Sequence, residues 1–172
     1  AAPFIYLIQE AGVKRLQTPR KYLKIVRPIM ISRGDKRIAL YPSEHFKVTY
    51  SISYDHPLLR HQSRTLRITE ESFIEELAPA RTFCLEHEAE ALRAAGLAKG
   101  ANYENTLVIG KDGLPISNAL RFPDEYTRHK TLDLYGDLVL LGARLEARVL
   151  AYKAGHALNA ALVREVAARG PL

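Results

Sequence analysis

The sequence predicts an α+β fold, a two-layer sandwich in which helices pack on one face of an antiparallel sheet, with a small helix and hairpin insertion. The first observation is that β-rich segments fill the first half and helical segments the second. The second is that 47% of the 172 residues are hydrophobic, enough to bury the core of one domain. We therefore expect a single domain over 1–172.

The first half is predicted to begin with a short helix and to continue as an antiparallel meander. Residues 3–12 form the predicted helix, which Gly12 ends. Thr69 is the predicted N-cap of the next helix, at 70–78, because Glu70 and Glu71 fall in its first turn. Between the two helices, β-rich segments bounded by Pro, Gly or polar turns predict strands at 21–31, 36–42, 45–54 and 64–69.

The second half is predicted to be mostly helical, and glycines mark the ends of its helices. Its predicted elements are a helix at 85–96, a hairpin at 105–117, a long helix at 124–142, a strand at 144–155 and a helix at 156–170. The hairpin turns at "KDG" (111–113), and the last helix ends at Gly170 and Pro171. Residues 85–118 are the predicted insertion.

The charge of the chain is concentrated near its start. The net charge is +6, and residues 1–40 hold nine of the 25 Lys and Arg but only two of the 19 acidic residues. Such a segment could meet phosphate, nucleic acid or an acidic partner. Because its cations alternate with apolar residues at strand-like spacing, the favoured alternative is a solvated sheet edge.

The cellular compartment is predicted from the cysteine content and from the lack of a long apolar run. The single cysteine, Cys84, excludes an internal disulfide and fits a reducing cytoplasm. No apolar run approaches the ~20 residues of a membrane-spanning helix. We therefore expect a cytoplasmic protein without a transmembrane segment.

His129, Asp133 and Asp137 follow one another at intervals of four along the predicted helix 124–142. Leucines flank them, so the helix is predicted to be buried nearly all round, its carboxylates included. A buried carboxylate needs a cation or a hydrogen-bond donor. An imidazole and a carboxylate four residues apart can bind one metal ion, but they can equally form an ion pair on a surface helix. The spacing alone leaves both alternatives open.

Three further side chains carry chemistry of their own. His156 begins the last helix beside Gly155, where its ring can face either a site or solvent. Asp137 as a partner would hold that ring protonated, as a general acid requires. Cys84 has no base nearby in the sequence and is predicted to be a small apolar filler. His56 is predicted to have a turn role.

Several motifs closely resemble the UDP-3-O-acyl-N-acetylglucosamine deacetylases, a family of zinc amidases that commit bacteria to lipid A synthesis. The motifs are "ARTF" (80–83), "LRFPDEYTRHKTLDLYGDLVLLG" (120–142), "AYKAGHALNAALV" (151–163), "DHP" (55–57) and the opening "AAPFIYLI". The resemblance covers the chain from end to end. It covers only the C-terminal half of the enzyme, however.

The resemblance implies a metal site and a catalytic group. His129 and Asp133 match two of the three protein ligands of Zn²⁺. His156 matches the catalytic histidine, and Asp137 matches the acid that orients and charges it. Thr82 matches the threonine whose hydroxyl assists the oxyanion.

The resemblance also implies substrate contacts. Lys130 and Lys153 match lysines that meet the polar and diphosphate groups of the substrate. Tyr54 takes the place of an aromatic residue that stacks near the uridine. Phe83 and the insertion 85–118 resemble the walls of the passage that holds the acyl chain.

The implied reaction is hydrolysis of the acetamide of UDP-3-O-acyl-N-acetylglucosamine, which releases acetate and a free amine. The third zinc ligand, a histidine, and the glutamate base belong to the N-terminal domain of the enzyme, and no matching motif exists in these residues. The isolated chain is therefore predicted to be inactive, with that domain as its partner.

The sequence is also compatible with two rival functions. The first is a non-catalytic α+β binding module that uses the basic N-terminal segment, and the second is a degenerate, structural copy of the domain. A nucleic-acid module needs exposed cations and aromatics on one face rather than buried carboxylates, so no nucleic-acid partner is expected. Retention of His129, Asp133, Asp137 and His156 argues against the degenerate copy.

Overall fold

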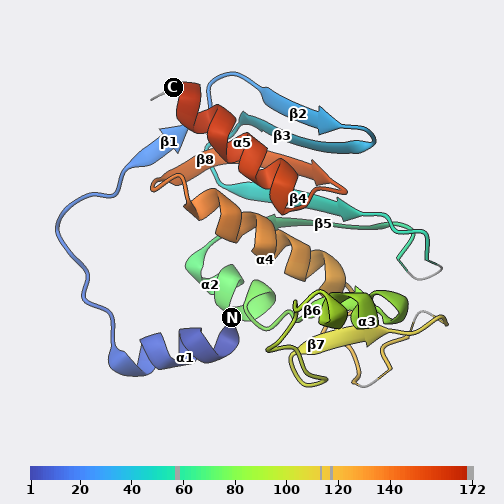
Figure 1. Cartoon of the computed structure of the whole chain (residues 1–172). Helices are drawn as coiled ribbons and strands as arrows, with labels where there is room; N and C mark the ends of the chain where they lie inside the picture. Colours follow the sequence, from blue (N-terminus) through green and yellow to red (C-terminus); the bar gives the residue numbers. More distant parts are fainter. Residues whose placement is uncertain (57–58, 113, 117, 170–172) are drawn as a thin grey trace.

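A six-stranded sheet with two long helices on one face forms the body of the protein in this computed structural model (Figure 1). The structure describes residues 1–56, 59–112, 114–116 and 118–169. The strands of this sheet are β1 (Tyr22–Lys24), β2 (Ile29–Arg33), β3 (Lys36–Pro42), β4 (Lys47–Ile52), β5 (Gln62–Arg67) and β8 (Arg144–Tyr152). The α+β class predicted from the sequence is confirmed.

The order of the strands differs from the predicted meander. The sheet runs β2-β3-β8-β4-β5, so β8 lies between β3 and β4. Its alternate residues Leu145, Ala147, Val149 and Ala151 are buried, as the centre of a sheet covered on one face requires. Because β8 runs parallel to β4 and to β1 but antiparallel to β3, the sheet is mixed rather than wholly antiparallel.

The basic N-terminal segment is less regular than its spacing predicts. The first helix is present as α1 (Ala2–Ala11), which ends at Gly12 with φ of 80°. Residues 12–21 then form no strand, and the predicted strand 21–31 divides into β1 and the edge strand β2. Pro28 lies between them and has no N–H to donate to a neighbouring strand. The sheet-edge prediction, made for residues 12–28, therefore holds for β1, which pairs with the start of β8, but is wrong for 12–21.

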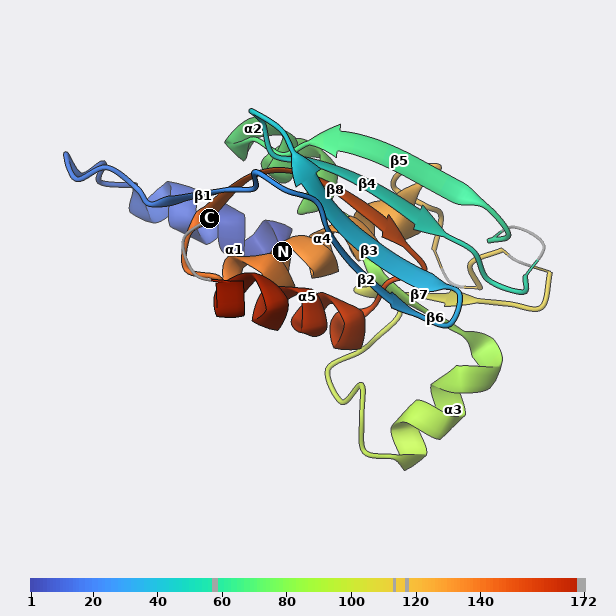
Figure 2. The same ribbon diagram turned by 90° about the horizontal axis from the view of Figure 1, so that it is seen from above.

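Two helices cover one face of the sheet, as Figure 2 shows from above. They are α4 (Glu125–Val139) and α5 (His156–Arg169), which confirm the two helices predicted there. The predicted end of the last helix at Gly170 and Pro171 lies outside the described residues. None of the helices in the described ranges is long and apolar enough to cross a bilayer.

The first turn of helix α4 is buried on all sides, but its later turns are buried on one side only, which corrects the prediction of burial nearly all round. Leu134 and Leu138 are fully buried against the sheet, whereas Val139 and Leu140 are 55% and 75% exposed. Asp133 and Asp137 are half-buried. Nothing in the described part of the chain covers the outer side of the helix, so the carboxylates lie at an open surface rather than in the core.

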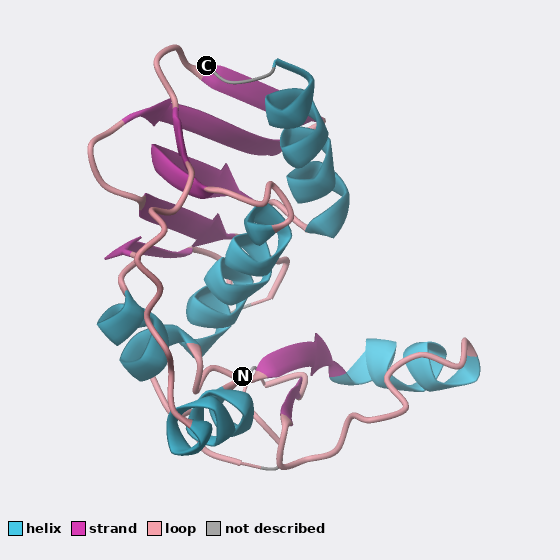
Figure 3. Ribbon diagram, turned by 90° about the vertical axis from the view of Figure 1, so that its left-hand side faces the viewer, coloured by secondary structure: helices cyan, strands magenta, loops and turns pink. Residues whose placement is uncertain are grey.

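A separate strand–helix–strand unit lies beside the N-terminal end of α4 (Figure 3). It consists of β6 (Thr82–Leu85), α3 (Glu86–Ala94) and β7 (Thr106–Ile109), and β6 pairs in parallel with β7. Of the predicted hairpin, the structure has the strand β7 and a turn after it, in which Ile116 N–H donates to the carbonyl of Val108. The Gly113 of its "KDG" motif lies outside the described residues.

The predicted N-cap at Thr69 is confirmed. It begins the short helix α2 (Glu70–Ser72), which continues as the π-helical turn η1 (Phe73–Leu77). The Thr69 hydroxyl oxygen accepts from Ser72 N–H at 3.1 Å, and the Ser72 hydroxyl oxygen accepts from Thr69 N–H at 2.9 Å. Together they form a reciprocal capping box.

Replacing Thr69 with Ala removes this cap. We expect the free energy of unfolding to fall by about 1 kcal/mol, measured by urea denaturation. The matched control is Thr69→Ser, which retains the hydroxyl. Its free energy of unfolding should fall by only a few tenths of the loss expected for Thr69→Ala. Equal losses in the two variants would show that the hydroxyl does not cap the helix.

Candidate active site

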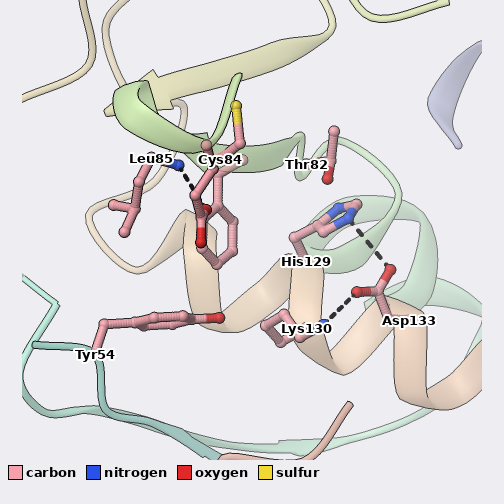
Figure 4. A pocket seen from close by; sticks show the side chains of 9 residues that line it. Tyr54, Thr82, Cys84, Leu85, His129, Lys130 and Asp133 are labelled. Carbon is pink, nitrogen blue, oxygen red and sulfur yellow. Dashed lines mark hydrogen bonds and ion pairs between the residues drawn. The ribbon is translucent and has the colours of Figure 1, made fainter. Parts of the chain in front are cut away.

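A pocket of about 220 Å³ lies between α4, β6 and the segment that follows β4 (Figure 4). The residues that line it are Tyr54, Thr82, Phe83, Cys84, Leu85, Glu88, His129, Lys130 and Asp133. Six of the nine site residues predicted from the sequence are therefore gathered here. The other three, Asp137, Lys153 and His156, lie outside its lining.

His129 and Asp133 face each other across one turn of α4. His129 Nδ1 lies 3.2 Å from the carbonyl oxygen of Ala80, which can only accept, so Nδ1 carries the hydrogen. His129 Nε2 then faces Asp133 Oδ1 at 3.2 Å. A neutral Nε2 and a carboxylate oxygen are both acceptors, so a proton or a metal ion must lie between them.

This pair fits a zinc ion by its chemistry and its spacing. Zinc takes imidazole nitrogen and carboxylate oxygen at about 2.0–2.2 Å, which places two ligand atoms of a tetrahedron about 3.3–3.6 Å apart. The backbone carbonyl of Ala80 fixes the tautomer of His129, as the outer partners of metal-binding histidines commonly do. Among the described residues, no third His, Cys, Asp or Glu joins them.

Asp133 is held in its ionised form. Burial raises the pKa of its carboxyl, but the hydrogen bonds and charges contributed by His129 and Lys130 outweigh burial. Its pKa is therefore well below the usual range. Lys130 Nζ donates to Asp133 Oδ2 at 2.8 Å, on the side away from His129. The carboxylate is thus available to a cation at any physiological pH.

A second polar group lies one turn further along α4. Asp137 Oδ2 accepts from His156 Nδ1 at 2.8 Å, so the contact expected between these residues is present. The same oxygen accepts from Asn159 Nδ2, also at 2.8 Å. The His156 side chain is 69% exposed, and its Nε2 has no hydrogen-bond partner in the part of the chain that the structure describes. Nε2 is therefore free to exchange a proton with a bound molecule.

Asn159 was missed in the sequence. The signal is present in "HALN", because residues three apart on a helix share a face, and Asn159 stands one turn after His156. A fully buried amide on this face needs a partner. Asp137 provides it, and Asn159 in return holds the carboxylate under the imidazole.

A buried ion pair sets the position of Thr82. Glu125, fully buried at the start of α4, accepts from Arg81 Nε and from the Arg81 N–H, both at 2.9 Å. The N–H of Arg121 donates to its other oxygen at 2.6 Å. Burial raises the pKa of Glu125, but the hydrogen bonds from Arg81 and Arg121 lower it overall. The start of β6 is thereby tied to α4, so Thr82 lies beside His129 (Figure 4).

Aromatic rings form another wall of the pocket. Phe83 packs edge-to-face on Tyr54, with ring centroids 5.8 Å apart, and on Tyr126 at 5.0 Å. Cys84 is half-buried in the same wall, and burial, followed by the charge of Glu88, raises the pKa of its thiol. The thiol therefore stays protonated, in agreement with the prediction that it is not a nucleophile.

Two predicted residues are placed elsewhere. Lys153 forms an ion pair with Asp35 at 2.5 Å, near the turn between β2 and β3, so its contact with substrate stays a prediction. His56 is buried and hydrogen-bonds through Nε2 to the carbonyl oxygen of Gly110 at 3.2 Å. It joins the segment after β4 to the end of β7, which is more than the turn role predicted for it.

Known proteins match this chain over nearly its whole length. The family model described as "LpxC: UDP-3-O-acyl N-acetylglycosamine deacetylase" matches residues 1–168. A protein named UDP-3-O-acyl-N-acetylglucosamine deacetylase from Syntrophotalea carbinolica is 45% identical over 168 residues, covering 98% of this chain and 54% of that protein. One of the same name from Anaeromyxobacter sp. (strain Fw109-5) is 46% identical, covering 98% and 55%. The chain spans about half the length of these curated relatives.

Proposed function

Because the chain belongs to the UDP-3-O-acyl N-acetylglycosamine deacetylase family, we propose that it supplies half of the active site of a zinc-dependent amidase. The reaction is removal of the acetyl group from UDP-3-O-acyl-N-acetylglucosamine, the committed step of lipid A synthesis, in the cytoplasm. The observation that carries the proposal is the convergence of His129 Nε2 and Asp133 Oδ1, with the His156–Asp137 pair one turn away.

The metal would be held by His129 Nε2 and the carboxylate of Asp133. Zinc bound there supplies Lewis-acid polarisation of the acetamide carbonyl and of the attacking water. Ala80 and Lys130 support the two ligands, the first through the tautomer of His129 and the second through the other carboxylate oxygen. This outer support orients the ligand atoms before substrate arrives.

His156 and Thr82 act on the reacting group. Asp137 accepts the hydrogen on Nδ1 and stabilises the protonated ring, so that Nε2 carries a proton toward the substrate. In the proposed reaction this proton and the Thr82 hydroxyl stabilise the oxyanion, and His156 then donates to the departing amine. Acetate leaves, and the 2-amino sugar remains.

The half-length match supports the proposal that the rest of the site lies in another domain. The third zinc ligand and the glutamate base are assigned to the N-terminal domain of the intact enzyme, so the isolated chain is proposed to be inactive. Lys130 and Lys153 are assigned to the polar and diphosphate groups of the substrate, and Tyr54 to the uridine. The aromatic wall with Phe83, together with the β6–α3–β7 unit, is assigned to the acyl chain.

The test uses the intact protein that contains both halves. We expect Asp133→Ala to lower the zinc content, measured by elemental analysis, well below one ion per protein and to abolish release of acetate. The matched control is Asp112→Ala, which removes an exposed carboxylate in the turn after β7 and should leave both unchanged. Full zinc content and activity in Asp133→Ala would refute the proposal. Stoichiometric, tight zinc binding by the isolated chain would refute the divided site.

A further inference from the structure

One face of the main sheet carries no helices, as Figure 2 shows, and a row of three cations crosses it. In the strand register Lys47 on β4 lies opposite Arg67 on β5 and opposite Arg148 on β8. Their neighbours Val48, Leu66 and Val149 are buried under the helices, so by strand alternation the three cations point to the opposite face. We propose that this face docks on the anionic lipid headgroups of a membrane surface.

Within the described ranges, none of the three cations forms an ion pair. The Arg67 guanidinium has one hydrogen-bond partner there, His45, at 3.4 Å between Nη2 and Nδ1. Glu146 is the acidic residue of β8 on this face, and it lies opposite Lys24 of β1 rather than in the row. Like charges directly opposite on neighbouring strands are destabilising. Phosphate groups laid across the row would relieve that repulsion.

The next row of the same face is uncharged and partly apolar. It runs from Thr65 through Thr49, Leu150 and Ala39 to Met30, which is 61% exposed on the edge strand β2. The hydroxyls of Thr49 and Thr65 are 2.8 Å apart and satisfy each other. Cations beside apolar and satisfied groups fit the boundary between headgroups and acyl chains. Tyr41 of β3 extends the cation row opposite Arg148, and an amphipathic aromatic ring also suits the membrane interface.

This inference goes beyond the proposed deacetylation, and the two can fail separately. The three cations lie outside the pocket lining, so they take no part in the proposed chemistry. The proposed substrate carries an acyl chain and is itself amphiphilic. Docking on a membrane would keep the enzyme where such molecules collect.

The experiment measures flotation of the intact protein with two kinds of vesicle. One is phosphatidylcholine alone, and the other is phosphatidylcholine mixed with phosphatidylglycerol. We expect binding only to the second, with release at high ionic strength. The triple variant Lys47→Gln, Arg67→Gln and Arg148→Gln should bind about 100-fold more weakly, because each cation near an anionic surface contributes about fivefold.

The control variant removes the same charge elsewhere. Arg93→Gln, Lys99→Gln and Arg164→Gln replace three exposed cations outside the main sheet, and we expect at most a several-fold effect. The proposal is overturned if the intact protein ignores anionic vesicles, or if the two triple variants weaken equally. It is also overturned if the sheet-face cations are required for binding single-stranded RNA but not vesicles.

Two further readouts separate this proposal from its alternatives. Deacetylation of dissolved substrate should be the same in the parent and the sheet-face variant. If that variant lost activity but bound vesicles as well as the parent does, the claim that the sheet face and the pocket act separately would be overturned. Thermal unfolding should show the sheet-face variant at least as stable as the parent, since like charges are removed. A clear loss of stability would mean that the row is structural.

Discussion

Replacing Arg81 with Met lowers the free energy of unfolding by about 3–5 kcal/mol, the cost of leaving a buried carboxylate without its partner. Glu125 is fully buried, and Arg81 Nε donates to it at 2.9 Å. The remaining backbone donors satisfy some of its lone pairs but supply no full positive charge. Urea denaturation of Arg81→Met beside the parent measures the loss.

The matched comparison is the double variant Arg81→Met with Glu125→Gln. It should recover a large part of the loss, because no unpaired charge remains buried. A double variant as unstable as Arg81→Met would show that the damage comes from lost packing.

The contribution of the Glu125 charge to the free energy of unfolding depends on pH with a defined sign. The pKa of Glu125 is lower in the folded protein than in the unfolded chain. Its charge therefore stabilises the folded protein at pH values above 4.5, the usual pKa of a glutamate. That stability disappears as the pH falls through the folded pKa. The difference between the parent and Glu125→Gln should therefore be constant at neutral pH and shrink in acid. A difference that grows in acid would contradict this account.

Replacing His156 with Ala in the intact enzyme lowers kcat by a factor on the order of 10²–10⁴, the usual contribution of a positioned acid. The imidazole pairs with Asp137 through Nδ1, and its Nε2 has no hydrogen-bond partner among the described residues. Because His156 is not one of the two candidate zinc ligands, the zinc content should stay at the parental level. Acetate release and elemental analysis of the same samples separate the two effects.

Two variants sharpen this prediction. His61→Ala removes another exposed histidine, on the segment before β5, and should leave kcat unchanged. Asp137→Asn keeps the side-chain shape but loses the charge that pairs with His156 Nδ1, so kcat should fall while the zinc content stays at the parental level. A parental kcat in His156→Ala would remove this residue from the mechanism.

The candidate site was predictable where its geometry is local. Spacing along one helix places His129, Asp133 and Asp137 on one side of α4, whatever surrounds it. The contact between Asp137 and His156 was also anticipated, because a histidine that begins a helix beside a glycine is free to turn toward an acid. Spacing does not choose between a metal ion and an ion pair; the resemblance favours the metal, which stays a prediction.

Contacts between distant segments were not predictable in this way. Nothing in the sequence pairs Arg81 with Glu125, 44 positions later, or aims the carbonyl of Ala80 at His129. The parallel pairing of β6 with β7 was missed because local turn residues predict a hairpin and cannot indicate a partner some 20 residues earlier. The exposure of Leu140 was missed because a leucine on a helix is ordinarily buried.

The place of β8 in the sheet has a consequence for synthesis of the chain on the ribosome. Both hairpins, β2–β3 and β4–β5, are complete well before β8, which is the last strand to be made. Until it emerges, β3 and β4 each present an open edge that can pair with another chain. Joining the hairpins is a long-range event that comes late, and such events are slow. A nascent chain that ends before residue 144 would therefore contain two hairpins, each with an unpaired edge. C-terminal truncations are for this reason expected to aggregate rather than to fold in part.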